Sequence, residues 1–267
     1  MCGRFTSFTA PDRLIDTFEV EQVKTEPLPL RYNVAPTDPV YAVAERRGRH
    51  EGDAVVRQLG AFRWGLVPSW AKDPAVGSKM INARAETVAT KPAYRQALRR
   101  RRCIIPADGF YEWQVRDGAS PQGRLPYAIV GRDHQPLAFA GLWDIWRDPS
   151  RPDDEPLRTC VIVTTTANEA LAPIHHRMPV VLPQAVWGCW LDPSLEDPDE
   201  LERLLVPAAA DALVAYPVST RVNRVGNDGP ELLEPLDAVA GTGPLEARLP
   251  GLVESAPGAD PGGGPAG

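Results

Sequence analysis

Cys2 is the residue with the most distinctive chemistry in this chain, because it directly follows the initiator methionine. Removal of Met1 would leave a free α-amine and a thiol on adjacent carbons. These two nucleophiles can attack the same aldehyde carbon and close a five-membered ring. An α-amine titrates near about pH 8, so roughly a tenth of it is uncharged and nucleophilic at pH 7. We therefore expect Schiff-base chemistry at Cys2, the alternative being a cysteine placed by chance in a frayed terminus.

A carboxylate and two imidazoles could supply the proton transfers that such chemistry requires. Glu112 lies between Tyr111 and Trp113, and an apolar environment would raise the pKa of its carboxyl group toward neutrality, as a general acid or base needs. The alternative is an exposed strand glutamate that alternates with buried aromatic residues. His175 and His176 are adjacent, so we expect them to point to opposite sides and only one of them to face a given pocket.

Nucleic-acid binding would have to depend on local features of the chain. The formal net charge is -6, which excludes a global basic field. The arginine run at residues 99–102 is predicted to end a helix, where cations are favourable, and to be solvated there. Trp64 and Trp70 bracket a Gly- and Pro-containing segment, and such a pair is typical of a core or of a surface on which bases stack.

The four cysteines give no sign of a metal site. Cys2, Cys103, Cys160 and Cys189 are widely spaced, without a CxxC motif or paired histidine spacing, so we expect neither a metal nor a cofactor. The last three lie beside apolar residues and are predicted to be buried. Without a signal peptide or an apolar run of about 18 residues, we expect a cytoplasmic protein with free thiols.

The elements that must position these residues are mostly strands. Alternation and apolar runs predict strands, and helical spacing or capping predicts helices. The predicted strands cover residues 40–44, 54–62, 103–107, 109–115, 126–130, 137–146, 159–165, 177–182 and 213–219. The predicted helices cover residues 11–19, 90–102 with Thr90 as cap, 168–173, 183–191 and 198–205. The proline-rich stretch 25–39 is predicted to be an extended loop that presents Arg31, Tyr32 and Asn33.

Composition predicts one domain and a tail. A chain of 267 residues is long enough to bury a substantial core. Residues 1–235 are predicted to form the domain. Residues 236–267 are rich in Gly, Pro and Ala and are predicted to be disordered, because they cannot bury enough apolar surface to offset the entropy of ordering.

Five separated motifs occur along the chain in a characteristic order: MCGRF, RYNVAPT, WGLVPSW followed by INARAET, PADGFYEW and IHHRMPVVL. In this order they resemble the SOS response-associated peptidase (SRAP) family, whose members shield abasic sites in single-stranded DNA. The resemblance covers roughly residues 1–235. It implies an α+β fold: one compact, β-rich domain with a mixed, barrel-like sheet and short helices.

The resemblance also implies roles for individual residues. Cys2 would form first a Schiff base and then a thiazolidine with the ring-opened aldehyde of an abasic site. Asn33 would orient the terminus and the opened sugar. Glu112 would act as the acid and base, and His175 would assist ring opening or reversal. Contacts with DNA are implied for a further set of residues, Gly3, Arg4, Pro36, Trp70, Asn82 and Arg84. Ala71 stands where relatives often place a second aromatic residue, which predicts weaker stacking of a neighbouring base.

The predicted function is therefore covalent capture of abasic sites in single-stranded DNA during the DNA damage (SOS) response, which protects the lesion. We expect a crosslinking enzyme with lyase-like activity and N-terminal autoprocessing (peptidase) activity. It would act as a monomer without a cofactor, away from membranes, and would associate with the nucleoid when bound to DNA. The sequence leaves open whether replication or repair proteins are further partners.

Two other classes of function fit some of the same residues. In an N-terminal-nucleophile cysteine amidohydrolase or self-processing peptidase, the Cys2 thiolate would attack an amide and Asn33 would be an oxyanion donor. Reversing the charges of Arg4 and Arg84 would spare that activity but would abolish abasic-site capture. A non-covalent reader of single-stranded DNA would keep its binding after Cys2→Ala, whereas a crosslinking protein would lose its adduct.

Overall fold

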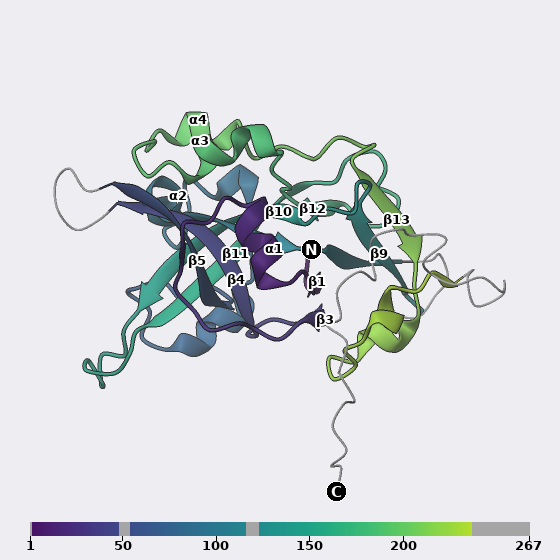
Figure 1. Ribbon diagram of the computed structural model, residues 1–267, viewed down its shortest axis with the longest axis horizontal. Helices are drawn as coiled ribbons and strands as arrows, with labels where there is room; N and C mark the ends of the chain where they lie inside the picture. Colours follow the sequence, from purple (N-terminus) through teal and green to yellow (C-terminus); the bar gives the residue numbers. More distant parts are fainter. Residues whose placement is uncertain (1, 48–53, 116–122, 237–267) are drawn as a thin grey trace, which may run out of the picture.

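The computed structural model describes residues 2–47, 54–115 and 123–236, and it contains two β-sheets (Figure 1). The first sheet is antiparallel. Its strands follow the order β13 (Leu213–Pro217), β9 (Leu125–Gly131), β8 (Gly109–Gln114), β1 (Phe5–Ser7) and β3 (Arg31–Val34). The N-terminal strand β1 thus lies between two partners, and this placement fixes the residues that precede it.

The second sheet closes into a barrel. Its order is β12 (Arg177–Pro179), β11 (Leu157–Thr166), β10 (Leu137–Trp146), β7 (Arg102–Ala107), β4 (Pro39–Arg47), β5 (Val55–Trp64) and β2 (Gln22–Val23). Strand β5 also pairs in parallel with β11, with Cys160 opposite Trp64, so β11, β10, β7, β4 and β5 form a ring. Strand β6 (Asn82–Arg84) pairs with β11 outside this order. The predicted α+β fold with a barrel-like sheet is confirmed.

Short helices surround the two sheets, and some of them cover the outer face of the barrel. The α-helices are α1 (Pro11–Thr17), α2 (Arg95–Arg100), α3 (Trp187–Leu191) and α4 (Pro198–Glu202). The 3-10 helices are η1 (Pro74–Lys79), η2 (Ala85–Thr87), η3 (Gln184–Val186), η4 (Thr220–Asn223) and η5 (Pro230–Leu233). Phe18 and Trp187 stack with ring centroids 4.7 Å apart, and both belong to one cluster with Tyr41 and Val161 of the barrel strands.

The inner face of the barrel packs against the first sheet. Alternate residues of a strand point to the same face, and the inward residues of β5, β7, β10 and β11 form a cluster with Phe5 and Phe110. The Phe5 ring lies 5.0 Å from the Trp64 ring and 6.1 Å from the Phe139 ring, centroid to centroid. Edge-on aromatic contacts of this kind stabilise the packing beyond the buried area alone. Cys2 is part of this same cluster.

Most of the predicted elements are confirmed, and tertiary pairing explains the differences. The helices at 11–19, 183–191 and 198–205 and the strands listed above are present with small changes of boundary. Residues 31–34 were predicted to be a presented loop, which is wrong. They form β3, because Val34 pairs with Phe5 of β1.

Two helix predictions are wrong in part or in whole. The helix predicted at 90–102 begins only at Arg95, and Thr90 is not its cap, since the Thr90 hydroxyl donates to the carbonyl of Thr87. The stretch 168–173 forms turns, because Pro173 has no N–H with which to continue a helix. The segment predicted at 236–267 lies, from residue 237 onward, outside the described residues, as does Met1.

The cysteine predictions are confirmed for Cys103 and Cys160, which are buried, and wrong for Cys189, which is exposed. On α3 the buried positions are taken by Trp187, Trp190 and Leu191. Cys189 therefore faces solvent on the opposite side of the helix.

Arg102 contradicts the prediction of a solvated arginine run. Arg99 and Arg100 are exposed, but Arg102 is only 4% exposed. Its guanidinium donates to the main-chain carbonyls of Leu98 (2.7 Å), Arg99 (2.6 Å), Trp190 (2.6 Å) and Asp192. These carbonyls lie at the C-terminal ends of α2 and α3, where a helix leaves acceptors without intrahelical donors. One buried arginine thus joins two helix ends to the start of β7.

We predict that Arg102→Met lowers the free energy of unfolding by about 2–4 kcal/mol, because buried carbonyls lose their charged donor. Urea denaturation measures this change. Arg99→Met, an exposed change in the same run, should alter the stability by less than about 0.5 kcal/mol. Equal effects of the two substitutions would contradict the assigned role of Arg102.

Candidate active site

Cys2 is held in place rather than frayed. Its side chain is fully buried, and its main-chain carbonyl accepts a hydrogen bond of 2.7 Å from the Asn82 amide. Asn82 is the first residue of β6, which pairs with the barrel strand β11. Burial, followed by the charge of Glu112, raises the pKa of the Cys2 thiol. The thiol is therefore protonated at neutral pH and must lose its proton before it can act as a thiolate.

The pairing of β1 with β8 brings Glu112 to the same region. Phe5 lies opposite Phe110, and the Tyr111 N–H donates to the Arg4 carbonyl at 3.0 Å. By alternation, Glu112 shares a face with Phe110, and it is only 5% exposed. The interpretation of Glu112 as an exposed strand residue is therefore wrong. Burial raises the pKa of its carboxyl group to about 7, the range in which a carboxyl group can both donate and accept protons.

His175 lies beside this carboxylate. Its Nδ1 atom is 3.9 Å from Glu112 Oε2 and 3.0 Å from both the main-chain nitrogen and the main-chain oxygen of Arg177. A neutral ring can accept the Arg177 N–H, and a ring protonated at Nδ1 can donate to the Arg177 carbonyl. Both protonation states therefore have a main-chain partner. Burial lowers the pKa of His175, which favours the neutral ring at pH 7.

His176 is exposed, but the two histidines do not point to opposite sides. Their ring centroids are 4.4 Å apart with an interplanar angle of 31°. The prediction was wrong because strict alternation applies to strands, and these residues precede β12. His175 is the one of the two that approaches Glu112.

Arg177 was not singled out in the sequence, although it follows the histidine pair. Its guanidinium makes two hydrogen bonds with the Glu86 carboxylate, at 2.5 and 3.0 Å, and one of 2.6 Å with the Thr164 carbonyl. The hydrogen bonds from Arg177 lower the pKa of Glu86. Because Arg177 also supplies the main-chain partners of His175, this anchoring fixes the position of the imidazole.

Asn33 and Arg4 bind each other and the loop at residues 222–227. Asn33 is fully buried, and its amide nitrogen lies 2.9–3.3 Å from the carbonyls of Val222, Arg224 and Asn227. Its Oδ1 atom accepts a hydrogen bond of 2.9 Å from Arg4, and Arg4 also donates to the Val222 carbonyl at 3.0 Å. These two residues fix the segment 222–227 against strands β1 and β3. The loop itself carried no recognisable sequence signal.

The remaining residues with an implied role divide into exposed and inward-directed ones. Trp70 is 68% exposed and Arg84 is exposed, while Gly3 and Pro36 are partly exposed. The Asn82 amide is directed to the Cys2 carbonyl. Trp64, in contrast with Trp70, is a core residue with no exposed surface.

Ala71 does not belong to an exposed surface. It is 6% exposed, and its carbonyl accepts the indole N–H of Trp146 at 2.7 Å. The small residue at this position therefore packs beneath Trp146. Trp70, by contrast, is exposed.

The described part of the chain contains no cluster of three or more His, Cys, Asp or Glu residues that could hold a metal ion. Within the same ranges, no helix has the length and apolar character needed to cross a membrane.

A family model, SOS response associated peptidase (SRAP), matches residues 1–225. The chain belongs to the SRAP family. It is 44% identical over 235 residues to the abasic site processing protein YoqW of Bacillus subtilis (strain 168), which covers 88% of this chain and 99% of the relative. The abasic site processing protein HMCES of Gallus gallus is 36% identical over 232 residues, covering 77% of this chain and 66% of the relative.

Two crystal structures share the fold of this SRAP protein. A protein from Bacteroides thetaiotaomicron superposes with a TM-score of 0.72 at 24% identity, covering 88% of this chain and 99% of the other. A protein from Bordetella bronchiseptica gives a TM-score of 0.65 at 28% identity, covering 82% of this chain and 100% of the other. The predicted family membership and fold are thus both confirmed.

The raised pKa of Glu112 predicts a pH dependence of stability. Because burial raises the pKa from 4.5 to about 7, the folded state binds more protons than the unfolded state in this window. The contribution of Glu112 is therefore fully present below about pH 4.5 and is lost as the pH rises through about 7. The free energy of unfolding of the wild type, taken relative to that of Glu112→Gln, should fall across this range in urea titrations, because the carboxyl group ionises while the glutamine stays neutral. A difference that is independent of pH would contradict the assignment.

Proposed function

We propose that this SRAP protein captures abasic sites in single-stranded DNA covalently, through the α-amine and thiol of Cys2 after removal of Met1. The observation that carries the proposal is a buried, anchored Cys2 in the electrostatic field of Glu112, with His175 3.9 Å from that carboxylate. The names of relatives 36–44% identical, which describe abasic site processing proteins, support the same substrate.

The chemistry needs one aldehyde, one amine and one thiol. The amine nitrogen attacks the aldehyde carbon of the ring-opened sugar and gives a hemiaminal. Loss of the hydroxyl group as water gives an imine. The thiol then adds across the C=N bond: sulfur bonds to carbon, the thiol proton passes to nitrogen, and a thiazolidine results. One water molecule is released overall, and neither an oxidant nor a reductant is required.

Glu112 and His175 would move the protons in these steps. A carboxyl group with a pKa of about 7 can protonate the departing hydroxyl group and can then, as a carboxylate, accept the proton of the thiol. Deprotonation of Cys2 at the moment of attack matters because burial raises the pKa of that thiol. The neutral His175 would relay protons to Glu112 or assist the opening of the sugar, with Arg177 holding its Nδ1 atom.

The surrounding residues would position the strand. Asn82 fixes the Cys2 main chain, and Asn33 with Arg4 fixes the adjoining segment at residues 222–227. Exposed Arg84 and Trp70 suit a phosphate contact and a stacked base, and the partly exposed Gly3 and Pro36 would be further contacts. A single strand is the expected substrate, because its sugar can reach a buried thiol without the cost of unstacking a duplex.

Intact-protein mass spectrometry tests the proposal. Wild type lacking Met1, incubated with a single-stranded oligonucleotide that carries one abasic site, should gain the mass of the oligonucleotide less one water. The adduct should persist without a reductant. Cys2→Ser, which keeps the amine but lacks the thiol, should give an adduct that hydrolyses, and Cys2→Ala should give none that persists.

The same assay separates catalysis from simple reactivity. Glu112→Gln should slow adduct formation by about 100-fold, the usual scale for loss of a general acid or base, whereas exposed His176→Gln should not slow it. If the trimmed, folded wild type forms no adduct, the crosslinking proposal is wrong. Cleavage of amide substrates by that protein would then favour the amidohydrolase alternative.

A further inference from the structure

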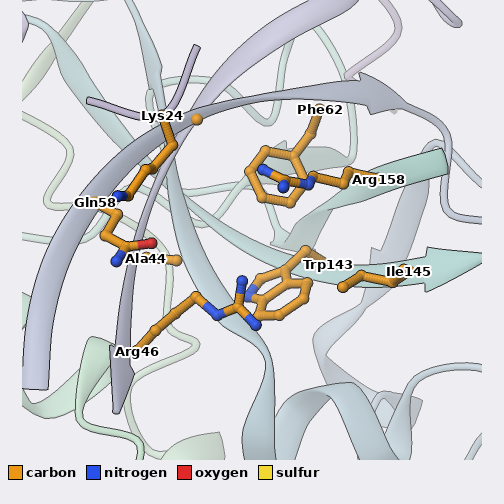
Figure 2. A pocket seen from close by; sticks show the side chains of 9 residues that line it. Lys24, Ala44, Arg46, Gln58, Phe62, Trp143, Ile145 and Arg158 are labelled. Atoms are coloured by element: carbon orange, nitrogen blue, oxygen red, sulfur yellow. The ribbon is translucent and has the colours of Figure 1, made fainter. Parts of the chain in front are cut away.

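A pocket with a polar lining lies at the end of the barrel away from Cys2. On the inner face, Phe62 and Trp143 contact each other with centroids 5.9 Å apart. Trp143 lies four residues along β10 from Phe139, the residue that contacts Phe5, which is about 13 Å at the usual rise of a strand. Beyond this aromatic pair the lining becomes polar and cationic: Lys24, Arg46, Gln58 and Arg158 (Figure 2).

Two cations at this end, Lys24 and Arg158, line the pocket without a carboxylate partner among the described residues. None of the described residues that line the pocket carries a carboxylate. Among the described residues, neither Lys24 nor Arg158 makes an ion pair within 4.0 Å. An adjoining depression adds Arg63 and one acidic residue, Glu155. In a chain of net charge -6, such a concentration of positive charge favours a local anion site.

Trp143 supplies an independent sign of a missing acceptor. It is 6% exposed, and its buried indole N–H has no hydrogen-bond acceptor among the described residues. The other buried tryptophans each donate to a main-chain carbonyl at 2.7–3.0 Å: Trp64, Trp146, Trp187 and Trp190. A buried indole N–H usually has a partner, because leaving a buried donor unpaired is costly.

Arg46 lies beside the same indole ring. Its guanidinium carbon lies 5.2 Å from the centroid of the Trp143 ring, and Figure 2 shows the guanidinium beside the indole. An oxyanion placed there could accept from the indole N–H and from Arg46 together. Lys24 and Arg158 would add charge from the other walls of the pocket.

We propose that this end of the barrel binds a phosphate group, at a site separate from Cys2. Phosphate is the favoured chemistry because it offers several acceptor oxygens and more than one negative charge to three cations and a neutral donor. Its source would be either the backbone of a nucleic-acid strand or a free nucleotide. The inference does not depend on covalent capture at Cys2.

Titration followed by the indole N–H signals in ¹⁵N-resolved NMR tests the proposal. Inorganic phosphate should shift the Trp143 signal, which is assigned by its disappearance in Trp143→Phe. The double variant Lys24→Gln/Arg158→Gln should bind phosphate at least about tenfold more weakly, a loss of roughly 1.4 kcal/mol. The matched control Lys91→Gln/Arg95→Gln removes two exposed cations elsewhere and should bind as the wild type does.

Three ligands distinguish a nucleic-acid backbone from a free nucleotide as the source of the phosphate group. Tighter binding of an undamaged single-stranded oligonucleotide than of thymidine monophosphate or phosphate, read at Trp143, would identify a nucleic-acid backbone. Tighter binding of the mononucleotide would identify a free nucleotide. The proposal fails if no probe shifts Trp143, if sodium chloride at matched ionic strength produces the same shift, or if the Lys24/Arg158 variant binds as tightly as the wild type.

Discussion

The hydrogen bond between the Asn82 amide and the Cys2 carbonyl is the interaction on which the site depends most. A chain terminus ordinarily frays, but here β1 lies between β3 and β8, and Cys2, three residues before Phe5, is hydrogen-bonded to Asn82 of β6. The barrel core that surrounds Phe5 completes the restraint. A cysteine that would otherwise be mobile is thereby held at a fixed place, in the electrostatic field of the buried Glu112.

The same burial governs the acid–base properties of the site. It raises the pKa of the Cys2 thiol and of Glu112 and lowers that of His175, so each group is shifted toward its neutral form. A neutral thiol, a carboxyl group close to half-protonated near pH 7 and a neutral imidazole are suited to passing protons among themselves. The ion pair with Glu86 anchors Arg177, whose main-chain nitrogen and oxygen each lie 3.0 Å from Nδ1 of His175.

The sequence predicted the features that arise from local pattern. Strands such as β10 and β11 have strong apolar and β-branched patterns, and the motifs around Cys2, Glu112 and His175 are contiguous enough to be recognised as those of a family. The features it did not predict depend on contacts between distant residues. Closure of the barrel requires β5 to meet β11, and Asn33 binds carbonyls 189–194 residues away.

Arg102 is a further residue whose environment the sequence did not predict. Its neighbours Arg99 and Arg100 are solvated as expected, and nothing local distinguishes it from them. Only the docking of α3, 88 residues later, supplies the carbonyl of Trp190 that makes this position buried. Burial of a charged residue is therefore decided by the tertiary structure and not by its own segment.

The most direct measurement is the ¹³C NMR spectrum of the protein after reaction with an oligonucleotide labelled at C1′ of its abasic site. Covalent capture by both nucleophiles predicts a C1′ resonance typical of a saturated carbon bonded to nitrogen and sulfur, and this resonance should be absent with Cys2→Ser. A C1′ resonance that stays at the position of the free aldehyde and its hydrated or cyclic forms, or that stops at an imine in the wild type, would contradict the account.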